Sequence, residues 1–258
     1  MTIASTERTC LITGGSGGIA RALAATLRAQ GWRVARAGRS ADKLAPDDGD
    51  LLIEADVGTE AGAVLAVAQA TATFGAPPSA VVNAAGAILL SSIVRTSEAQ
   101  YRDCLSANLD TAFFTAKAYV AALAQAQKDG GSGAGRLLLF SSVAAGIGVG
   151  NHTAIAMAKG AIEALVRSLA ADHSAMGLRV NAIAPGLMAT PLTAKLVANE
   201  ASKKAISAQY PLGRHGEADD AAQLAAFLLG PGGDWINGQV IALDGGFTAV
   251  RPMVKVAG

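Results

Sequence analysis

Short apolar runs alternate with longer helical patterns along most of this chain. Strands that alternate with helices form βαβ units, and such units build a parallel sheet whose two faces are covered by helices. The alternation therefore predicts a doubly wound α/β fold, with a sheet of about seven strands in three layers. The seven runs expected to form strands are 9–13, 33–38, 51–55, 79–83, 136–141, 178–184 and 238–243.

The length of the chain favours one domain. With 258 residues it can bury one sizeable core, and α/β folds of about this size commonly remain undivided. The glycine- and serine-rich stretch at 128–135 is interpreted as a flexible connection within the domain, because the strand that follows needs the preceding sheet to pair with. We therefore expect residues 1–258 to form a single domain.

A glycine-rich segment, TGGSGGIA from Thr13 to Ala20, joins the first expected strand to an amphipathic helix. Glycines let the backbone turn tightly and approach a pyrophosphate, whose charge is met by the free N–H groups at the helix N-terminus. Two registers fit: G-x-G-x-x-A starting at Gly15, and T-G-x-x-x-G-x-G starting at Thr13 with Ala20 in place of the last glycine. A tight turn without a ligand is the alternative. The context of strand, turn and helix predicts a dinucleotide site.

The second expected strand indicates which dinucleotide binds. An NAD site usually carries Asp or Glu about 20 residues after the glycine turn, where the acid holds the ribose hydroxyls. Here that neighbourhood reads RVARAGRS, with Gly38 at the position of the acid and Arg39 directly after it. A guanidinium binds a 2′-phosphate that a carboxylate would repel, so NADP is expected rather than NAD. Alternatively, Arg39 is only a solvated loop residue.

Charge and hydropathy argue against two classes of partner. The formal net charge is +1 and no basic block is present, so nucleic acid is not an expected partner. The N-terminus has no apolar stretch before Glu7, which is unlike a signal peptide and favours a cytoplasmic location. The uncharged stretch 137–158 is interrupted by glycines, Asn151 and His152, so we do not expect it to span a membrane.

The cysteines and the low charge content carry two further expectations. Cys10 and Cys104 lie far apart with no CxxC pattern, so no metal site is expected. Only 16% of the residues are charged, which leaves little charge to cover the surface, so some outer faces are expected to be buried in an oligomer. We therefore expect a homo-oligomer, either a dimer or a tetramer.

These features resemble the short-chain dehydrogenase/reductase family in its single-domain cytosolic branch, over almost the whole chain. The resemblance implies a Rossmann fold and hydride transfer between a nicotinamide cofactor and a small carbonyl or alcohol substrate. It rests on TGGSGGIA, ADV at 55–57, NAAG at 83–86, ANLDTAFF at 107–114, LLLFSSVAAG at 137–146, APGLMATP at 184–191 and ALDGG at 242–246. Two departures are minor: Ala20 replaces a glycine and Ala84 replaces an asparagine.

The resemblance assigns roles to individual residues. In the family a serine polarises the substrate carbonyl, a lysine binds the ribose, and an asparagine anchors a water chain that reaches the lysine. Those catalytic roles would fall to Ser142, Lys159 and Asn108. The residues implied to bind the cofactor are Gly14, Ser16, Gly17, Gly18, Ile19, Arg39, Asp56, Val57, Asn83, Ala84, Ala85, Gly86, Lys159, Pro185, Gly186, Met188 and Thr190.

One departure from the family pattern is serious. The family's Y-x-x-x-K motif places a tyrosine four residues before the lysine and thirteen after the serine, and both counts reach Ile155. That tyrosine exchanges the proton with the substrate oxygen, and an isoleucine cannot do so. Loss of a general acid typically costs about 10² to 10⁴ in rate, so an enzyme of this kind needs a replacement.

The first candidate for the replacement is His152, because an imidazole exchanges protons near neutral pH. It precedes Ile155 by three residues and shares its face if the helix already extends there. The alternative is a histidine that only caps or packs the start of that helix. Tyr210, which lies in the segment that often folds over the substrate, and a water held by Lys159 are further candidates.

Three functions follow from these observations. The leading one is an NADP(H)-dependent oxidoreductase that uses His152 as the proton donor. The second is a dinucleotide-binding sensor or partner subunit that is weakly active or inactive. A third keeps the fold but catalyses a dehydration or an isomerisation. The substrate and the direction of the reaction cannot be read from the sequence.

Overall fold

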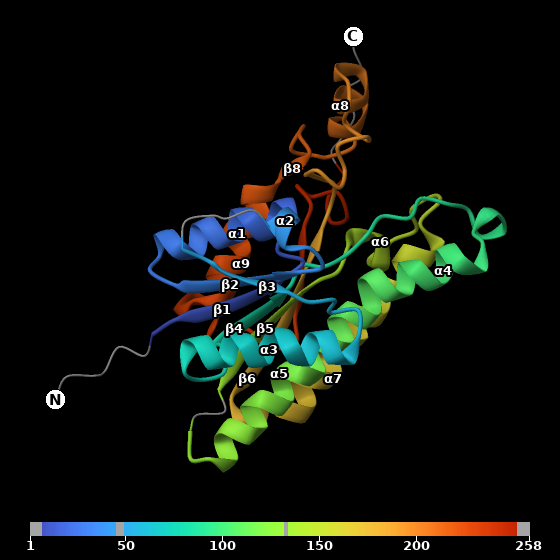
Figure 1. Cartoon of the computed structure of the whole chain (residues 1–258). Helices are drawn as coiled ribbons and strands as arrows, with labels where there is room; N and C mark the ends of the chain where they lie inside the picture. The colour runs from blue at the N-terminus through green and yellow to red at the C-terminus, as the bar shows by residue number, and fades with distance from the viewer. Residues whose placement is uncertain (1–6, 45–48, 132–133, 252–258) are drawn as a thin grey trace, which may run out of the picture.

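The computed structural model describes residues 7–44, 49–131 and 134–251, and its centre is a seven-stranded parallel sheet (Figure 1). The strands run in the order β3-β2-β1-β4-β5-β6-β9. Their bounds are Thr9–Thr13 (β1), Arg33–Gly38 (β2), Leu51–Glu54 (β3), Ala80–Asn83 (β4), Gly135–Phe140 (β5), Leu178–Pro185 (β6) and Val240–Leu243 (β9). The predicted doubly wound fold is therefore confirmed, and each predicted strand lies within two residues of its observed ends.

Helices cover both faces of this sheet (Figure 1). The first face carries α1 (Gly18–Ala29) and α9 (Ala218–Leu229), and the other carries α3 (Glu60–Phe74), α5 (Thr111–Lys128) and α7 (Thr153–His173). The remaining helices are α2 (Ala41–Leu44), α4 (Glu98–Leu105), α6 (Val143–Gly146) and α8 (Glu200–Ser207). The connection expected at 128–135 includes residues 132–133, which lie outside the described ranges.

The strands are apolar on both sides because each face of the sheet is buried. In β1, Cys10 and Ile12 pack toward α1 and α9, whereas Leu11 packs toward α3, α5 and α7. Successive side chains of a strand point to opposite faces, so a strand in the middle of a three-layer fold reads as a continuous apolar run. This is the physical origin of the runs that the sequence displays.

Local signals set the ends of several helices. Thr59 caps α3 by accepting the N–H of Gly62, and Gly75 ends that helix with φ +80°. Ser97 and Gln100 form the capping box expected from the sequence, at the start of α4. Between α4 and α5 the helix widens into a π-helical turn, Ser106–Asp110, which the sequence did not predict.

A second, two-stranded sheet lies outside the main one. It pairs β7 (Met188–Ala189) with β8 (Gly216–Glu217) and so closes the base of the segment between them. Helix α8 belongs to this segment, contains no buried residue and stands away from the sheet at the top of Figure 1. None of the helices in the described ranges is long and apolar enough to cross a membrane.

Candidate active site

The glycine turn connects the end of β1 to the N-terminus of α1. Gly14 has φ +69°, and a Cβ at this position would lie 2.5 Å from the backbone nitrogen of Ala85. Gly17 caps α1 without a side chain, so no side-chain oxygen satisfies the first N–H groups of the helix. Ser16, Gly18 and Ile19 complete a partly exposed surface of backbone donors. The turn therefore fits a pyrophosphate, in a cradle that added side chains would fill.

The two minor departures from the family pattern cause no conflict in this turn. Ala20 is fully buried in the core between α1 and the sheet, so its methyl group is accommodated. Ala84 is partly buried and packs against the same core.

Asn83, at the end of β4, lies beneath the turn. Its Oδ1 accepts hydrogen bonds from the Thr13 hydroxyl at 2.7 Å and from the Ala85 N–H at 3.2 Å. Its Nδ2 donates to the Thr111 hydroxyl at 3.4 Å. Asn83 is buried and therefore ties β1, the NAAG loop and α5 together, while the backbone of this loop faces the turn.

The outer end of the site is formed by β2 and β3. Arg39 follows β2 and is exposed, and so is Asp56, whose Oδ1 accepts the N–H of Gly58 at 3.0 Å. Val57 beside it is buried. The parallel register places Glu54 of β3 opposite Gly38, where its carboxylate accepts the N–H of Ala41 at 3.3 Å.

Glu54 is a residue that sequence reasoning missed. The acid expected of an NAD site was sought on β2, but here a carboxylate comes from the adjacent strand. The signal that could have found it is an acid at the carboxyl end of an expected strand, because such ends meet at the ligand-binding edge of a parallel sheet.

Arg36 is a second residue that sequence reasoning missed. It lies inside β2 and is fully buried, and its Nη1 donates to the carbonyl oxygen of Gly15 at 2.9 Å. Its Nε donates to Oδ2 of Asp50 at 2.6 Å. An arginine at an inward position of a buried strand is the signal, because charged side chains are almost never fully buried unless paired.

Lys159 and Asn108 converge on Gly86. A Cβ at Gly86 would lie 3.0 Å from Oδ1 of Asn108 and 3.6 Å from Nζ of Lys159. Lys159 is buried on α7 and donates to the carbonyl oxygen of Phe140 at 2.8 Å. Burial lowers the pKa of Lys159 to about 8, and the Cys104 sulfur acts in the opposite direction.

Asn108 owes its position to the π-helical turn. It is buried, and its Nδ2 donates to the carbonyl oxygens of Cys104 at 2.9 Å and Ala87 at 3.1 Å. Its Oδ1 accepts the N–H of Ala87 at 3.4 Å. Such turns occur frequently at functional sites because the extra residue re-aims a side chain. The structure thus brings together the lysine and the asparagine that the sequence singled out.

Two adjacent serines follow β5 and differ in their contacts. Ser141 is buried, and its hydroxyl donates to Glu163 at 2.8 Å, which ties β5 to α7. Ser142 is partly exposed and caps α6, with its Oγ accepting the N–H of Ala144 at 3.2 Å. The Ser142 hydroxyl keeps its proton for a further acceptor, so of the two it is the one that can polarise a carbonyl.

Ile155 occupies an apolar environment. It packs with Cys104 and Ala154, and Leu89 and Tyr101 lie against this cluster. Burial raises the pKa of the Cys104 thiol, although the Lys159 charge and the Asn108 amide lower it. The side chain at position 155 therefore offers packing and no exchangeable proton.

His152 caps α7. The helix begins at Thr153 and the backbone of His152 is not helical, with φ −111° and ψ 11°, so His152 does not share a helical face with Ile155. Its Nδ1 lies 2.7 Å from the carbonyl oxygen of Gly150, which can only accept, so Nδ1 carries a hydrogen. Nε2 is therefore the nitrogen that can exchange a proton. Asn151, with φ +61°, sets the direction of the chain before it.

The segment after β6 closes the site from the other side. A Cβ at Gly18 would lie 3.1 Å from the Cβ of Thr190 and 3.1 Å from the Cδ of Pro191, so this segment lies against the glycine turn. Pro185, Gly186 and Met188 lead into it from the end of β6.

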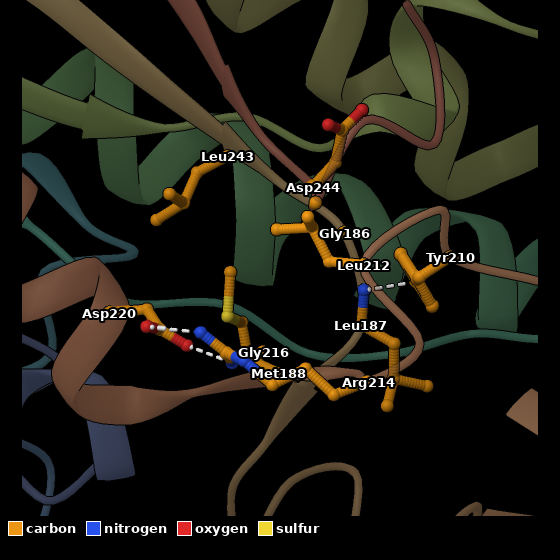
Figure 2. A pocket seen from close by; sticks show the side chains of 11 residues that line it. Gly186, Leu187, Met188, Tyr210, Leu212, Arg214, Gly216, Asp220, Leu243 and Asp244 are labelled. Carbon is orange, nitrogen blue, oxygen red and sulfur yellow. Dashed lines mark hydrogen bonds and ion pairs between the residues drawn. The ribbon is translucent and has the colours of Figure 1, made fainter. Parts of the chain in front are cut away.

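A pocket lies beside this segment (Figure 2), lined by Gly186, Leu187, Met188, Tyr210, Leu212, Arg214, Gly216, Asp220, Leu243, Asp244 and Gly245. The Tyr210 hydroxyl accepts the N–H of Leu187 at 2.7 Å, and its ring packs on Phe247 at 5.1 Å. Burial raises the pKa of the Tyr210 hydroxyl, with the Leu187 hydrogen bond acting in the opposite direction. Tyr210 therefore holds two backbone segments together.

Charged groups fix the rim of this pocket. Arg214 and Asp220 form a two-bond ion pair, with Nη1 to Oδ2 at 2.6 Å and Nη2 to Oδ1 at 2.9 Å (Figure 2). Partial burial works to raise the pKa of Asp244, but hydrogen bonds from Thr248 and Gly246 outweigh it, so this pKa lies below its ordinary value. Within the described ranges, no group of three or more His, Cys, Asp or Glu could hold a metal ion.

The chain is similar to several known proteins. Residues 14–248 match a family model described as Enoyl-(Acyl carrier protein) reductase. The chain is 33% identical over 253 residues to 2-(S)-hydroxypropyl-CoM dehydrogenase 3 of Xanthobacter autotrophicus, which covers 93% of this chain and 96% of that protein. It is also 33% identical over 223 residues to Inactive 2-(S)-hydroxypropyl-CoM dehydrogenase 2 of the same organism, with coverages of 84% and 94%.

A solved structure of the same kind is also similar to this chain. A short-chain type dehydrogenase/reductase from Mycobacterium ulcerans superimposes with a TM-score of 0.83 at 30% identity, and the match covers 93% of this chain and 89% of that one. The glycine turn, the NAAG loop, Asn108, Ser142 and Lys159 all lie within the residues matched by the family model.

Proposed function

Since the chain belongs to the short-chain dehydrogenase/reductase family, we propose that it is an NADP(H)-dependent oxidoreductase acting on a carbonyl or alcohol substrate. The observation that carries this proposal is the convergence of Lys159 and Asn108 on Gly86, in the loop that packs against the glycine turn. A chain that only needed the fold would gain nothing from a buried lysine at this point, because burying an ammonium is costly.

The residues present fit NADP along the whole edge of the sheet. The turn at 14–19 would hold the pyrophosphate, and Arg39 the 2′-phosphate. Asp56 and Val57 would contact the adenine, and the segment 185–190 the nicotinamide end. When bound, the cofactor supplies or accepts the hydride. Lys159 then positions the ribose, and its positive charge stabilises the bound state electrostatically.

The protein supplies the proton and the polarising group. In the direction of reduction, Ser142 would donate a hydrogen bond to the substrate oxygen and so polarise the carbonyl. Nε2 of protonated His152 then gives its proton to that oxygen, which leaves neutral His152 and the alcohol. The Nδ1 hydrogen bond to Gly150 supports this role, because it holds the ring in the tautomer that leaves Nε2 free.

The choice of NADP over NAD is tested at two residues of opposite charge. Arg39→Ala should weaken NADPH binding about tenfold and leave NADH nearly unchanged, because only NADPH carries the 2′-phosphate. Glu54→Gln should shift the preference further toward NADPH, because it removes a carboxylate beside the same position. If wild-type protein binds NADH as tightly as NADPH by calorimetry, the proposed preference is wrong.

A second function is favoured by Ile155 and by one relative. Ile155 packs in an apolar cluster and carries no exchangeable proton, and the relative named as an inactive dehydrogenase is 33% identical. The alternative is therefore a dinucleotide-binding sensor or partner subunit. It predicts tight NADPH binding by calorimetry with no turnover on a broad panel of ketones and aldehydes, whether or not His152 is replaced.

The surface supports a homo-oligomer, a dimer or a tetramer, as part of the same proposal. Phe113 on α5, Met157 on α7 and Phe227 on α9 are about half exposed, on helices that cover the two faces of the sheet. Large apolar side chains that face outward on adjacent helices commonly mark contact surfaces. Light scattering coupled to size exclusion measures the mass directly, and a mass of one chain contradicts this part of the proposal.

A further inference from the structure

The glycine turn rests on a buried arginine. Arg36 has no exposed surface, and its guanidinium donates from Nη1 to the Gly15 carbonyl at 2.9 Å. The N–H of Gly15 donates to the carbonyl oxygen of Ala37 at 2.9 Å. Both the donor and the acceptor of Gly15 are therefore held by β2.

The packing around Gly15 leaves no freedom for another arrangement. A Cβ at Gly15 would lie 2.7 Å from the Cβ of Arg36, so the turn crosses directly over this side chain. Gly14 is fixed in the left-handed region on one side, and α1 begins three residues later on the other. The orientation of the Gly15 peptide thus sets the direction in which the following N–H groups point.

A buried carboxylate completes the arrangement. Oδ2 of Asp50 accepts from Nε of Arg36 and from Nη1 of Arg28, each at 2.6 Å, and the Asp50 side chain is fully buried. Arg28 lies in the last turn of α1 and its side chain is 26% exposed. The carboxylate therefore compensates the charge of Arg36 and holds its planar guanidinium in one orientation.

A buried guanidinium needs a reason, because an aliphatic side chain would fill an inward position of β2 at lower cost. We propose that Arg36 is a positioning residue for the pyrophosphate of the dinucleotide. It acts through the Gly15 carbonyl and keeps the backbone donors of the turn aimed at the ligand. This inference rests on the proposed function to the extent that it requires a dinucleotide, but it applies to NADP and NAD alike.

The test replaces each arginine that shares Asp50. Arg36→Met removes the contact with Gly15 and leaves Asp50 paired with Arg28. Arg28→Met is the matched control, since it removes an ion pair with the same carboxylate but does not touch the turn. Binding of ADP, which carries the pyrophosphate, is compared with binding of adenosine 2′-monophosphate, which does not.

We expect Arg36→Met to raise the Kd of ADP about tenfold and to raise the KM for NADPH by a similar factor. This is the effect of losing a hydrogen bond from a charged donor. Binding of adenosine 2′-monophosphate should stay within about twofold, and kcat should change little. Arg28→Met should leave all of these near wild-type values even if it lowers Tm.

Three results separate the possibilities. If Arg36→Met and Arg28→Met weaken ADP binding equally, or if both nucleotides lose the same factor, Arg36 is only structural and the inference is overturned. If Arg36→Met does not fold, Arg36→Lys is compared with Arg28→Met instead. One ammonium cannot contact both the Gly15 carbonyl and Asp50 as the guanidinium does. A wild-type protein that binds neither NADPH nor NADH overturns the proposed function and this inference together, whereas equal effects in a protein that binds them overturn the inference alone.

Discussion

The glycine turn and the N-terminus of α7 are held in different ways. Gly14 packs against the backbone at Ala85, and Gly15 is bonded to β2 on both sides. His152, by contrast, is partly exposed and follows Asn151 with its positive φ, and its ring makes one hydrogen bond, to a carbonyl two residues earlier. The first region is fixed by long-range contacts and the second by a local loop.

We expect this difference to separate the binding of the cofactor from the chemistry performed on it. In the turn, a Cβ at Gly14 would lie 2.5 Å from the Ala85 nitrogen and one at Gly15 would lie 2.7 Å from the Arg36 Cβ, so a new side chain has no space there. At the start of α7, Ile155 packs with Cys104 and Ala154 in a small apolar cluster. We expect a site assembled in this way to keep its ligand when its proton donor changes.

Replacing Gly14 should abolish cofactor binding. Gly14→Val introduces a branched side chain at φ +69° and 2.5 Å from the Ala85 nitrogen, so the turn and the NAAG loop must separate. We expect no measurable NADPH binding by calorimetry. Gly146→Ala is the control, because a Cβ there meets nothing within 4 Å. Retained binding in Gly14→Val would show that the turn is not the binding element.

Replacing His152 should lower the rate and spare binding. His152→Ala removes the proposed acid, which typically costs about 10² to 10⁴ in kcat, while the Kd of NADPH should stay unchanged. Because the ring is partly exposed, added imidazole should restore part of the rate. A wild-type rate in this variant, in an otherwise active enzyme, would assign the proton to another group.

Restoring the phenol should make His152 dispensable. In the His152→Ala background, Ile155→Tyr should recover at least about tenfold in kcat, because a general acid again stands four residues before Lys159. The larger ring must displace the Cys104 cluster, so a loss of about 1 to 3 kcal/mol in stability is expected alongside. Ile155→Phe, with the same ring and no hydroxyl, is the control and should recover nothing.

Lys159 should give the smallest effect, a dependence of stability on pH. The folded protein releases the Lys159 proton near pH 8, whereas the unfolded chain keeps it up to the ordinary pKa of 10.5. Between these values the unfolded state binds more protons, so the contribution of Lys159 to the free energy of unfolding rises with pH. The free energies of unfolding of wild type and Lys159→Met, each measured by urea titration, should diverge progressively above about pH 8. If the two free energies depend on pH in the same way, the lysine keeps its proton in the folded state.

Much of the fold could be predicted because it depends on patterns that run along the chain. The seven strands appear as apolar runs since both faces of the sheet are buried, and the capping box at Ser97 is a local signal. The π-helical turn that carries Asn108 could not be predicted, because it depends on how α4 and α5 pack against α7 and the NAAG loop.

The site was predictable in part for the same reason. Motif spacing singled out Lys159 and Asn108, which the structure brings to the same glycine. The sequence signals for Glu54 and Arg36 were available, but the position of Glu54 beside Gly38 follows from the register between β2 and β3, and the role of Arg36 from the path of the turn above it. A shared face for His152 and Ile155 required the helix to extend already to position 152, but α7 begins at Thr153 and His152 is its non-helical N-cap.

We propose that this site both binds NADP and uses it without the tyrosine. The most direct measurement is single-turnover transfer of deuterium from stereospecifically deuterated NADPH to a panel of carbonyl compounds, followed by mass spectrometry. We predict transfer from one face of the nicotinamide only, at a rate that falls in His152→Ala while NADPH remains bound. Tight NADPH binding with no deuterium in any product would contradict the claim and leave the chain as a dinucleotide-binding protein.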